Sequence, residues 1–442
     1  MRILKIHFLL LMALISVEIK AQTTALLPQK VFDFIKQKRF DELFKLVDTS
    51  GLTKDFLASQ RAQMETNFTQ FGKVKKLIAI YEDEAGVKKR YSLCIQFKKE
   101  KKNIHFTVNA KQKIENYSIK EFNEAPFFQL KGYNGFAEVT DLTTEVKTRD
   151  GLTLGANIAF GDTSKQKSPL VIFVHGSGIS DRDETIGPNK PFRDFAQGLA
   201  QKGIVSLRYD KRGYDRHQLT KQMMDSIDIY TETIFDAIDA IHVAKQFSFI
   251  DTNQIYIMGH SQGAMCAPMI AKLSPKIKGI ILLAGPAKNL IDVLPEQARY
   301  MALLDDTITN LEEMQLTQNK WLVDKLKNPT ELKKMPKALL GGTGYKYWQS
   351  ISNFNQVETA KSLSIPIYIL NGENDFQVIM SEFELWKTEL ANKANVQYKS
   401  YPKLNHLFLE TVGERGMKEY DIPGHIPQYV IDDLVQFIKS TY

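Results

Sequence analysis

Five continuous apolar segments, separated by segments of helical periodicity, constrain the fold of this chain more than any other feature. The segments are Leu170–Val174, Ile204–Leu207, Ile255–Met258, Ile277–Ala284 and Ile365–Leu370. A strand that is apolar at every position is buried on both faces, as strands are in a parallel sheet that helices cover on both sides. The alternation of strands with helical segments favours the same architecture. The sequence therefore predicts an α/β domain over residues 144–442, built on a mostly parallel sheet with helices on both faces.

A different pattern precedes this domain. The periodicity is helical from Pro28 to about Phe71, and apolar and polar residues alternate after that. The expected strands are Tyr91–Phe97, Ile104–Val108 and Ile114–Ile119, with one more beginning at Val74. We expect a small α+β domain over residues 27–120 and a linker over residues 121–143. In element order it is similar to the small cone-shaped domains of the nuclear-transport-factor-like or cystatin-like type.

The first residues have the composition of a secretory signal peptide. Arg2 and Lys5 are followed by an apolar core, His7–Val17, and Ala21 is a small residue where cleavage is expected. The apolar core is shorter than the roughly 20 residues that span a bilayer. We therefore expect residues 1–21 to be removed, the protein to be secreted or periplasmic, and the mature chain to have no stable membrane span.

Charge and cysteine content exclude several function classes. The chain has 442 residues, with 58 Lys and Arg against 51 Asp and Glu, for a formal net charge of +7. The basic residues form no stripe with interleaved aromatics, so the sequence does not indicate nucleic-acid binding. The two cysteines, Cys94 and Cys266, are too few for a disulfide scaffold or a Cys-rich zinc site. We expect both to be buried free thiols.

Residues 259–263, Gly-His-Ser-Gln-Gly, form a G-x-S-x-G motif between a predicted strand and a segment of helical character. In this motif the serine lies on a strained strand-to-helix turn that exposes its hydroxyl. Gly259 and Gly263 leave room where a Cβ would crowd the neighbouring strand and helix. The helix N-terminus that follows favours negative charge developing nearby. The motif therefore predicts Ser261 as a nucleophile.

A serine nucleophile needs a general base and an acid that orients the base. Asp375 lies in a loop just after the strand Ile365–Leu370, and His406 lies in a loop just after a predicted strand at Val396–Tyr401. Both loops are expected at the sheet edge where the serine turn lies, so we predict Asp375 and His406 as its partners. Glu373 is the alternative acid, and His425 is the alternative base.

The turn after Leu170–Val174 is a candidate for stabilising an oxyanion. It reads His175-Gly176-Ser177. The backbone N–H of Ser177, together with that of Gln262, would hold the oxygen of a tetrahedral intermediate. His175 ends a strand directly before a glycine, so we expect it to shape the turn through a hydrogen bond rather than to act as a base.

Taken in order, these motifs resemble those of the α/β-hydrolases, and more narrowly those of the bacterial carboxylesterase and serine-aminopeptidase-like subgroup. The matching segments are residues 175–178, 181–184, 189–192, 208–213, 259–263 and 405–408. The order serine, acid, histidine is that of the same fold group. The chain departs from the subgroup at residues 214–217, Tyr-Asp-Arg-His, where the pattern continues with Gly-x-Ser. The resemblance implies that this loop lies near the pocket, so the departure bears on substrate preference and leaves the predicted triad intact.

Between the predicted strands ending at Ala284 and starting at Ile365 lies a long segment of mainly helical composition. It exceeds any plain connection, and insertions of this length are usually functional. We therefore expect a helical cap over about residues 286–360.

The favoured interpretation is a secreted serine hydrolase that cleaves carboxylic esters of small to medium acyl substrates through an acyl-enzyme. It requires no metal and no organic cofactor, and the sequence has no HExxH, P-loop or dinucleotide-binding motif. A serine peptidase, aminopeptidase or oligopeptidase-like, is the first alternative because the same triad cleaves amides. A non-catalytic binding protein with a hydrolase fold is the second. The expected partner is a small-molecule ester or peptide, and the N-terminal domain is a candidate surface for a homodimer.

Overall fold

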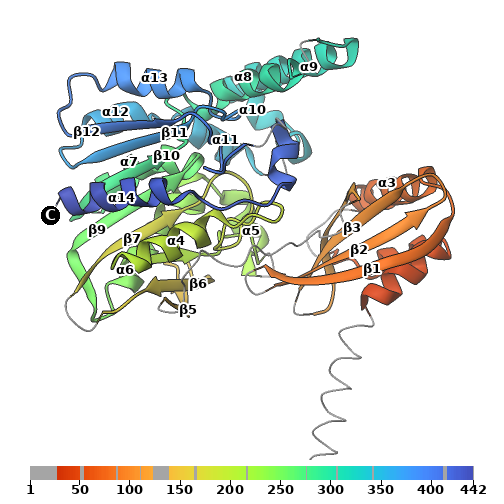
Figure 1. Cartoon of the computed structure of the whole chain (residues 1–442). Coiled ribbons are helices and arrows are strands. Elements are labelled where there is room, and N and C mark those ends of the chain that lie inside the picture. The colour runs from red at the N-terminus through yellow and green to blue at the C-terminus, as the bar shows by residue number, and fades with distance from the viewer. Residues whose placement is uncertain are drawn as a thin grey trace, which may run out of the picture. The chain divides into compact units, whose positions relative to one another are not determined.

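The computed structural model divides the chain into two compact units, residues 1–128 and 129–442 (Figure 1). The residues it describes are 27–49, 54–85, 88–109, 111–122, 139–163, 167–215, 218–274, 276–304, 307–340, 343–411 and 416–441. The predicted signal peptide at residues 1–21 and most of the predicted linker lie outside the described residues.

The first unit combines helices with an antiparallel sheet. Residues 27–36 are helical, and α2 (Phe40–Phe44) and α3 (Lys54–Gln70) follow. Four strands then pair in sequence order: β1 (Val74–Ala85), β2 (Lys88–Phe97), β3 (Lys101–Val108) and β4 (Ile114–Glu121). The core takes residues such as Val31 and Phe68 from the helices and Leu93 and Phe106 from the sheet. The predicted order of helices followed by a four-stranded antiparallel sheet is confirmed, whereas the likeness to cone-shaped domains stays a prediction.

The second unit is built on an eight-stranded sheet. Its strands are β5 (Thr140–Lys147), β6 (Thr153–Phe160), β7 (Ser168–Val174), β8 (Val205–Tyr209), β9 (Ile250–His260), β10 (Ile277–Leu283), β11 (Ile367–Gly372) and β12 (Val396–Tyr401). Their order across the sheet is β12-β11-β10-β9-β7-β8-β6-β5. β6 pairs antiparallel with β5 and β8, and the other neighbours are parallel. The predicted α/β fold with a mostly parallel sheet is confirmed.

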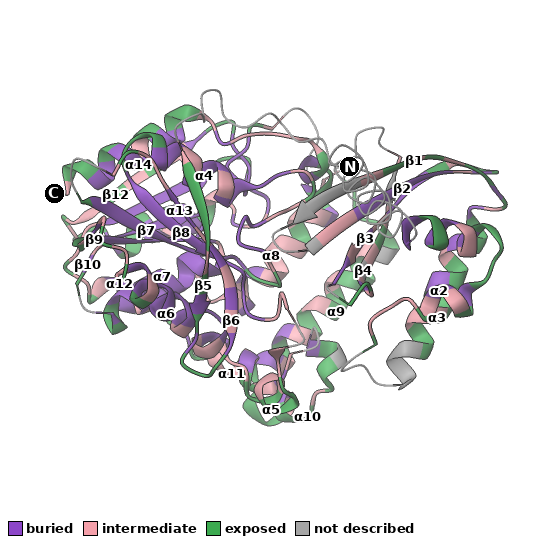
Figure 2. Cartoon of the chain, turned by 90° about the horizontal axis from the view of Figure 1, so that it is seen from below, coloured by how far each residue is buried: buried purple, intermediate pink, exposed green. Residues whose placement is uncertain are grey.

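Helices cover both faces of this sheet. Along β7, Leu170 and Ile172 join the core under α6 (Phe235–Ala244), α7 (Gln262–Leu273) and α13 (Met380–Glu389). Val171 and Phe173 join a second core under α4 (Pro191–Gln201) and α14 (Gln428–Ser440). Successive side chains of a strand point to opposite faces, so the continuous apolar segments supply both cores. The buried colour of the central strands in Figure 2 shows the result.

Most of the remaining helices lie between β10 and β11. They are α8 (Leu290–Ala302), α9 (Asn310–Lys327), α10 (Pro329–Lys334), the 3-10 turn η4 (Lys337–Leu340), α11 (Tyr345–Ser352) and α12 (Gln356–Lys361). Elsewhere are α5 (Lys221–Ser226), a π-helical turn η3 (Tyr230–Ile234) and a 3-10 turn η5 (Gly416–Asp421). Within the described ranges, no helix combines the length and the apolar character needed to cross a membrane. Cys94 and Cys266 are buried, and neither forms a disulfide within the described residues, as expected.

Candidate active site

Ser261 occupies a tight turn between a strand and a helix. β9 ends at His260 and α7 begins at Gln262. The φ angle of Ser261 is 53° and its ψ angle is −116°, a conformation that residues with a Cβ adopt only when the surroundings hold them there. Its N–H donates to the carbonyl oxygen of Leu283, at the end of the neighbouring strand β10, over 2.9 Å. The side chain is partly exposed, so the turn presents a hydroxyl group beyond the end of the sheet.

The two glycines of the motif allow the turn to pack this closely. A Cβ on Gly263 would overlap the carbonyl oxygen of Val174, at the end of β7. A Cβ on Gly259 would overlap the backbone of Gly263 one turn later. Because these atoms belong to the backbone, they cannot rotate out of the way, and any other residue would push the helix off the sheet.

Asp375 and His406 form a buried hydrogen-bonded pair. Each is 3% exposed. His406 Nδ1 donates to Asp375 Oδ2 over 2.7 Å. The other carboxylate oxygen, Oδ1, accepts from the backbone N–H groups of Gln377 and Val378 over 2.7 and 2.8 Å. With both oxygens engaged, the carboxylate is fixed in orientation, and the Nε2 atom of His406 is left as the proton acceptor of the ring.

The loop that carries His406 lies against the turn that carries Ser261. The ring centroids of His406 and His260 are 4.6 Å apart. His260 Nε2 donates to the carbonyl oxygen of His406 over 2.9 Å. Asp375 follows β11, which is parallel to β10, as β10 is to β9. The structure therefore brings Ser261, Asp375 and His406 to one edge of the sheet.

The two alternative residues lie elsewhere. Glu373 accepts a hydrogen bond from the hydroxyl of Ser400 over 2.7 Å on the exposed surface. His425 Nδ1 is 2.9 Å from the carboxylate of Asp194, which ties the start of α14 to α4. Each alternative residue is therefore engaged with a partner outside the Asp375–His406 pair.

His175 is bonded within the turn that it begins. Its Nε2 atom donates to the carbonyl oxygen of Asp181 over 2.9 Å, and the ring is 1% exposed. Burial lowers the pKa of His175 to about 4, so the ring is neutral near pH 7. A neutral, fully packed ring of this kind supports the turn.

The backbone amides of this turn have different surroundings. The N–H of Gly176 donates to Glu184 Oε1 over 2.8 Å and is therefore occupied. Within the described residues, the N–H groups of Ser177 and Gln262 have no acceptor. A Cβ on Gly176 would lie 3.3 Å from the Cβ of Ser261, so the turn packs directly against the serine. The N–H groups of the two predicted oxyanion donors therefore have no acceptor within the described residues.

A buried polar network lies behind these amides. Lys211 Nζ donates to the carbonyl oxygen of Gly176 over 2.7 Å and is 2.8 Å from Glu232 Oε1. The other oxygen of Glu232 accepts from the Gln262 side chain over 2.8 Å. Gln262 in turn accepts from the hydroxyl of Tyr347, on α11, over 3.0 Å. One hydrogen-bonded chain therefore connects the predicted oxyanion turn (residues 175–178), the residue after Ser261 and the helices between β10 and β11.

Sequence reasoning did not identify Glu184, Lys211, Glu232 or His260 as parts of the site. A usable signal was present for the first two, because Glu184 and Lys211 lie in residues 181–184 and 208–213, two of the segments that resemble the subgroup. Glu232 gave no such signal, since it is brought inward by η3, and π-helical turns of this kind occur frequently at functional sites.

The other charged residues of these runs hold the turn in place. Arg182 Nη2 is 2.7 Å from Asp210 Oδ2, and both side chains are buried. Arg208 pairs with Asp183 over 2.8 Å.

The sequence departs from the subgroup pattern at residues 214–217. Of these, Tyr214 and Asp215 are described, whereas 216 and 217 lie outside the described residues.

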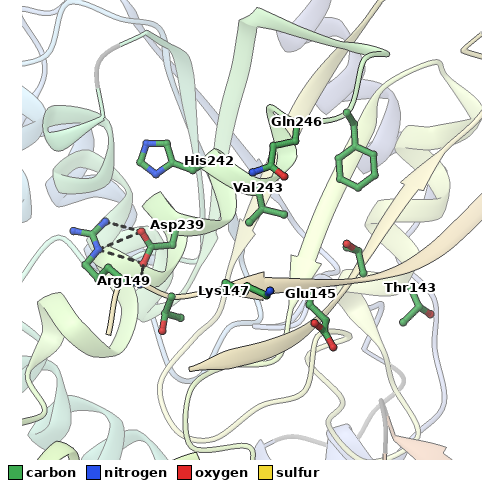
Figure 3. A pocket seen from close by; sticks show the side chains of 11 residues that line it. Thr143, Glu145, Lys147, Arg149, Asp239, His242, Val243 and Gln246 are labelled. Atoms are coloured by element: carbon green, nitrogen blue, oxygen red, sulfur yellow. Dashed lines mark hydrogen bonds and ion pairs between the residues drawn. The ribbon is translucent and has the colours of Figure 1, made fainter. Parts of the chain in front are cut away.

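A groove of about 1020 Å³ lies away from these residues, along the edge strand β5 and helix α6 (Figure 3). Arg149 and Asp239 form an ion pair of 2.8 Å at one side of it. Its lining contains none of Ser261, Asp375 and His406. The groove is therefore separate from the candidate active site.

Three known proteins illustrate what the chain is similar to. Esterase EstD of Thermotoga maritima is 36% identical over 270 residues, which cover 61% of this chain and 62% of the esterase. A monoglyceride lipase homolog of Monkeypox virus is 26% identical over 140 residues, covering 32% of this chain and 46% of the viral protein. The solved structure of Est1E from Butyrivibrio proteoclasticus covers 68% of this chain and 98% of its own, with a TM-score of 0.45 and 18% identity. The chain spans less than two thirds of the length of the two relatives matched by sequence.

Residues 166–412 match the protein family described as serine aminopeptidase, S33. The match covers more than half of the chain. It includes the predicted oxyanion turn after β7, the turn that carries Ser261, and the loops of Asp375 and His406. The chain therefore belongs to this family of serine hydrolases with the α/β-hydrolase fold.

Proposed function

We propose that this protein is a carboxylesterase that uses Ser261 as its nucleophile. The observation that carries the proposal is the fixed Asp375–His406 pair, bonded over 2.7 Å at the sheet edge where Ser261 lies on a strained turn. The combination of a nucleophile, a histidine and a carboxylate that orients the histidine is what acyl transfer requires. The 36% identity to an esterase favours esters as the substrate class.

In the proposed reaction, the Oγ atom of Ser261 attacks the acyl carbon while His406 Nε2 accepts the hydroxyl proton. Asp375 keeps the imidazole oriented and stabilises the imidazolium that forms. The N–H groups of Ser177 and Gln262 donate to the oxyanion of the tetrahedral intermediate. His406 then gives its proton to the departing alcohol, which leaves an acyl-enzyme. Water, activated by His406, releases the carboxylic acid and restores Ser261.

A serine peptidase is the second candidate, because the matching family is described as serine aminopeptidase. The same residues would attack a peptide carbonyl and protonate an amine leaving group. An aminopeptidase acts on substrates with a free amino terminus, and selecting them also requires an acidic group that faces the substrate.

Rates of ester and anilide hydrolysis distinguish a carboxylesterase from a serine peptidase. Purified full-length protein is assayed on short p-nitrophenyl acyl esters and on aminoacyl and peptidyl p-nitroanilides. The proposal expects kcat/KM to be at least about 100-fold higher for the esters, beyond the intrinsic reactivity difference measured in the same buffer without enzyme. A preference for anilides after that correction would replace the esterase proposal with the peptidase.

We also propose that the protein is exported after removal of residues 1–21, and this rests on the composition of the first residues alone. Sequencing the amino terminus of the protein from its native host would show a start at Gln22; a start at Met1 would contradict it. Homodimer formation through the first unit stays a prediction.

A further inference from the structure

Glu184 and His260 form a second buried acid–histidine pair beside the candidate triad. Glu184 is 3% exposed and His260 is 5% exposed. Glu184 Oε2 lies 3.0 Å from His260 Nδ1. Glu184 also has a φ angle of 52°, a left-handed conformation that a residue with a Cβ adopts only where its surroundings hold it there. The backbone that carries this carboxylate is therefore held by its surroundings.

The pair connects two parts of the proposed reaction site. Through its other oxygen, Glu184 accepts the N–H of Gly176, which directly precedes the proposed oxyanion donor Ser177. Through its other nitrogen, His260 donates to the carbonyl oxygen of His406. A continuous chain of contacts thus runs from the oxyanion turn to the backbone of His406, the proposed general base.

The partners of His260 determine its protonation state. A carbonyl oxygen only accepts hydrogen bonds, so Nε2 carries a proton. Nδ1 faces a carboxylate, and within the described residues neither this nitrogen nor Glu184 Oε2 has a hydrogen-bond partner of good angle. Each charge is therefore compensated mainly by the other, as an ion pair. His260 is an imidazolium when Nδ1 is protonated as well.

The electrostatic surroundings agree with this assignment. Burial disfavours the charged imidazolium, but the attraction of Glu184 outweighs it and raises the pKa of His260. Burial likewise opposes the charged carboxylate, and the attraction of His260 overcomes it and lowers the pKa of Glu184. The other groups that face the pair are His406 and Asp375 on the side of His260, and His175 on the side of Glu184.

We infer that Glu184 and His260 are positioning residues, a charged bridge that keeps the oxyanion turn and the loop of His406 in register. This inference rests on the proposed function, because it assigns the two connected parts to one reaction. Neither side chain needs to touch the substrate. Displacing either end by about 1 Å can cost about 100-fold in rate even when substrate binding is unchanged.

The variant E184Q tests the bridge with the least change in shape. The glutamine amide oxygen can still accept the N–H of Gly176, while its amide nitrogen would face Nδ1 of His260. Nδ1 must then accept, so the ring becomes neutral. We expect kcat on a p-nitrophenyl ester to fall about 10- to 100-fold with KM within about twofold. The matched control E389Q changes an exposed glutamate on α13 and should keep wild-type kinetics.

Histidine NMR gives a readout that does not depend on activity. The ring signals of His260 are assigned by their loss in the variant H260Q, whose amide can still donate to the carbonyl of His406. The expected result is a His260 ring that stays protonated to a higher pH in the wild type than in E184Q. Equal titration of the ring in the two proteins, or a lower pKa of the ring in E184Q with unchanged kcat, would overturn the inference.

The two measurements separate this inference from the proposed function. If the wild type hydrolyses no ester, the esterase proposal fails, and the charge state of His260 still shows whether the bridge exists. If E184Q does not fold, H260Q provides the kinetic test, because it leaves Glu184 without its counter-charge and should lower kcat in the same way. H260Q with wild-type kcat and KM would then contradict the bridge.

Discussion

Both oxygens of the Asp375 carboxylate are engaged, one by His406 and one by the backbone N–H groups of Gln377 and Val378. The two amides hold the acid in its loop, and the acid holds the imidazole. Glu184 shows the same use of a carboxylate, with one oxygen on the N–H of Gly176 and the other beside His260. At the scale of single residues, the candidate site is thus built from carboxylates that each join a backbone amide to a histidine.

Asp375→Asn tests the first of these carboxylates. The asparagine keeps the size of the side chain, but it offers an amide where His406 needs an acceptor, so the ring loses its tautomer and orientation. We expect kcat/KM on a p-nitrophenyl ester to fall by about 10³- to 10⁴-fold, with little change in the far-UV circular dichroism spectrum. The control is Glu373→Gln, which changes an exposed carboxylate two residues away. Equal losses in the two variants would mean that Asp375 does not orient the base.

At the scale of elements, the strand–turn–helix unit of β9 and α7 determines where Ser261 lies. The sequence alone predicts this unit, because β9 is apolar where it is buried and the two glycines mark the close contacts on either side of the serine. It also predicts the loops of Asp375 and His406, since both follow strands that are recognisable from their composition.

The contacts between elements could not be predicted in the same way. Glu184 and His260 lie far apart in the sequence, and no periodicity connects them. Likewise Tyr347 reaches Gln262 from α11, a helix whose placement depends on how the whole segment between β10 and β11 packs. Side-chain pairing across elements depends on three-dimensional placement that a pattern of apolar residues does not contain.

Gly263→Ala tests the close packing of α7 on β7. The added Cβ would overlap the carbonyl oxygen of Val174, and backbone atoms cannot move aside as a side chain can. We expect the free energy of unfolding, measured in urea, to fall by about 2 kcal/mol or more, together with a loss of ester hydrolysis. The matched change Gly344→Ala meets nothing closer than 3.6 Å and should be nearly neutral. A neutral Gly263→Ala would show that the turn does not need its glycine.

At the scale of the whole molecule, the chain forms two units with separate cores. All the residues proposed to take part in the reaction belong to the second unit. The change from helical and alternating patterns to continuous apolar segments is what allows the two units to be distinguished from sequence. The role of each unit depends on how its side chains are arranged in three dimensions, which no local sequence pattern contains.

The stability of the whole molecule should depend on pH through Glu419. Burial, together with the nearby charge of Asp375, raises the pKa of Glu419 to about 7 from an ordinary value of 4.5. Between these values the folded chain holds a proton that the unfolded chain has released, so stability falls as pH rises through this window and levels off above pH 7. Relative to Glu419→Gln, the wild type should lose up to about 3 kcal/mol of unfolding free energy between pH 4.5 and pH 8. Parallel stability curves for the two proteins in urea would contradict this assignment.

Covalent labelling of Ser261 tests the central claim most directly. The full-length protein, Ser261→Ala and the control Ser226→Ala, which changes an exposed serine on α5, are incubated with a fluorophosphonate probe and analysed by intact mass and peptide mapping. We expect one adduct on the peptide that contains residues 259–263 in the wild type and in the control, and none in Ser261→Ala. Labelling of Ser261→Ala to the wild-type extent, or an adduct mapped to another residue, would contradict the account.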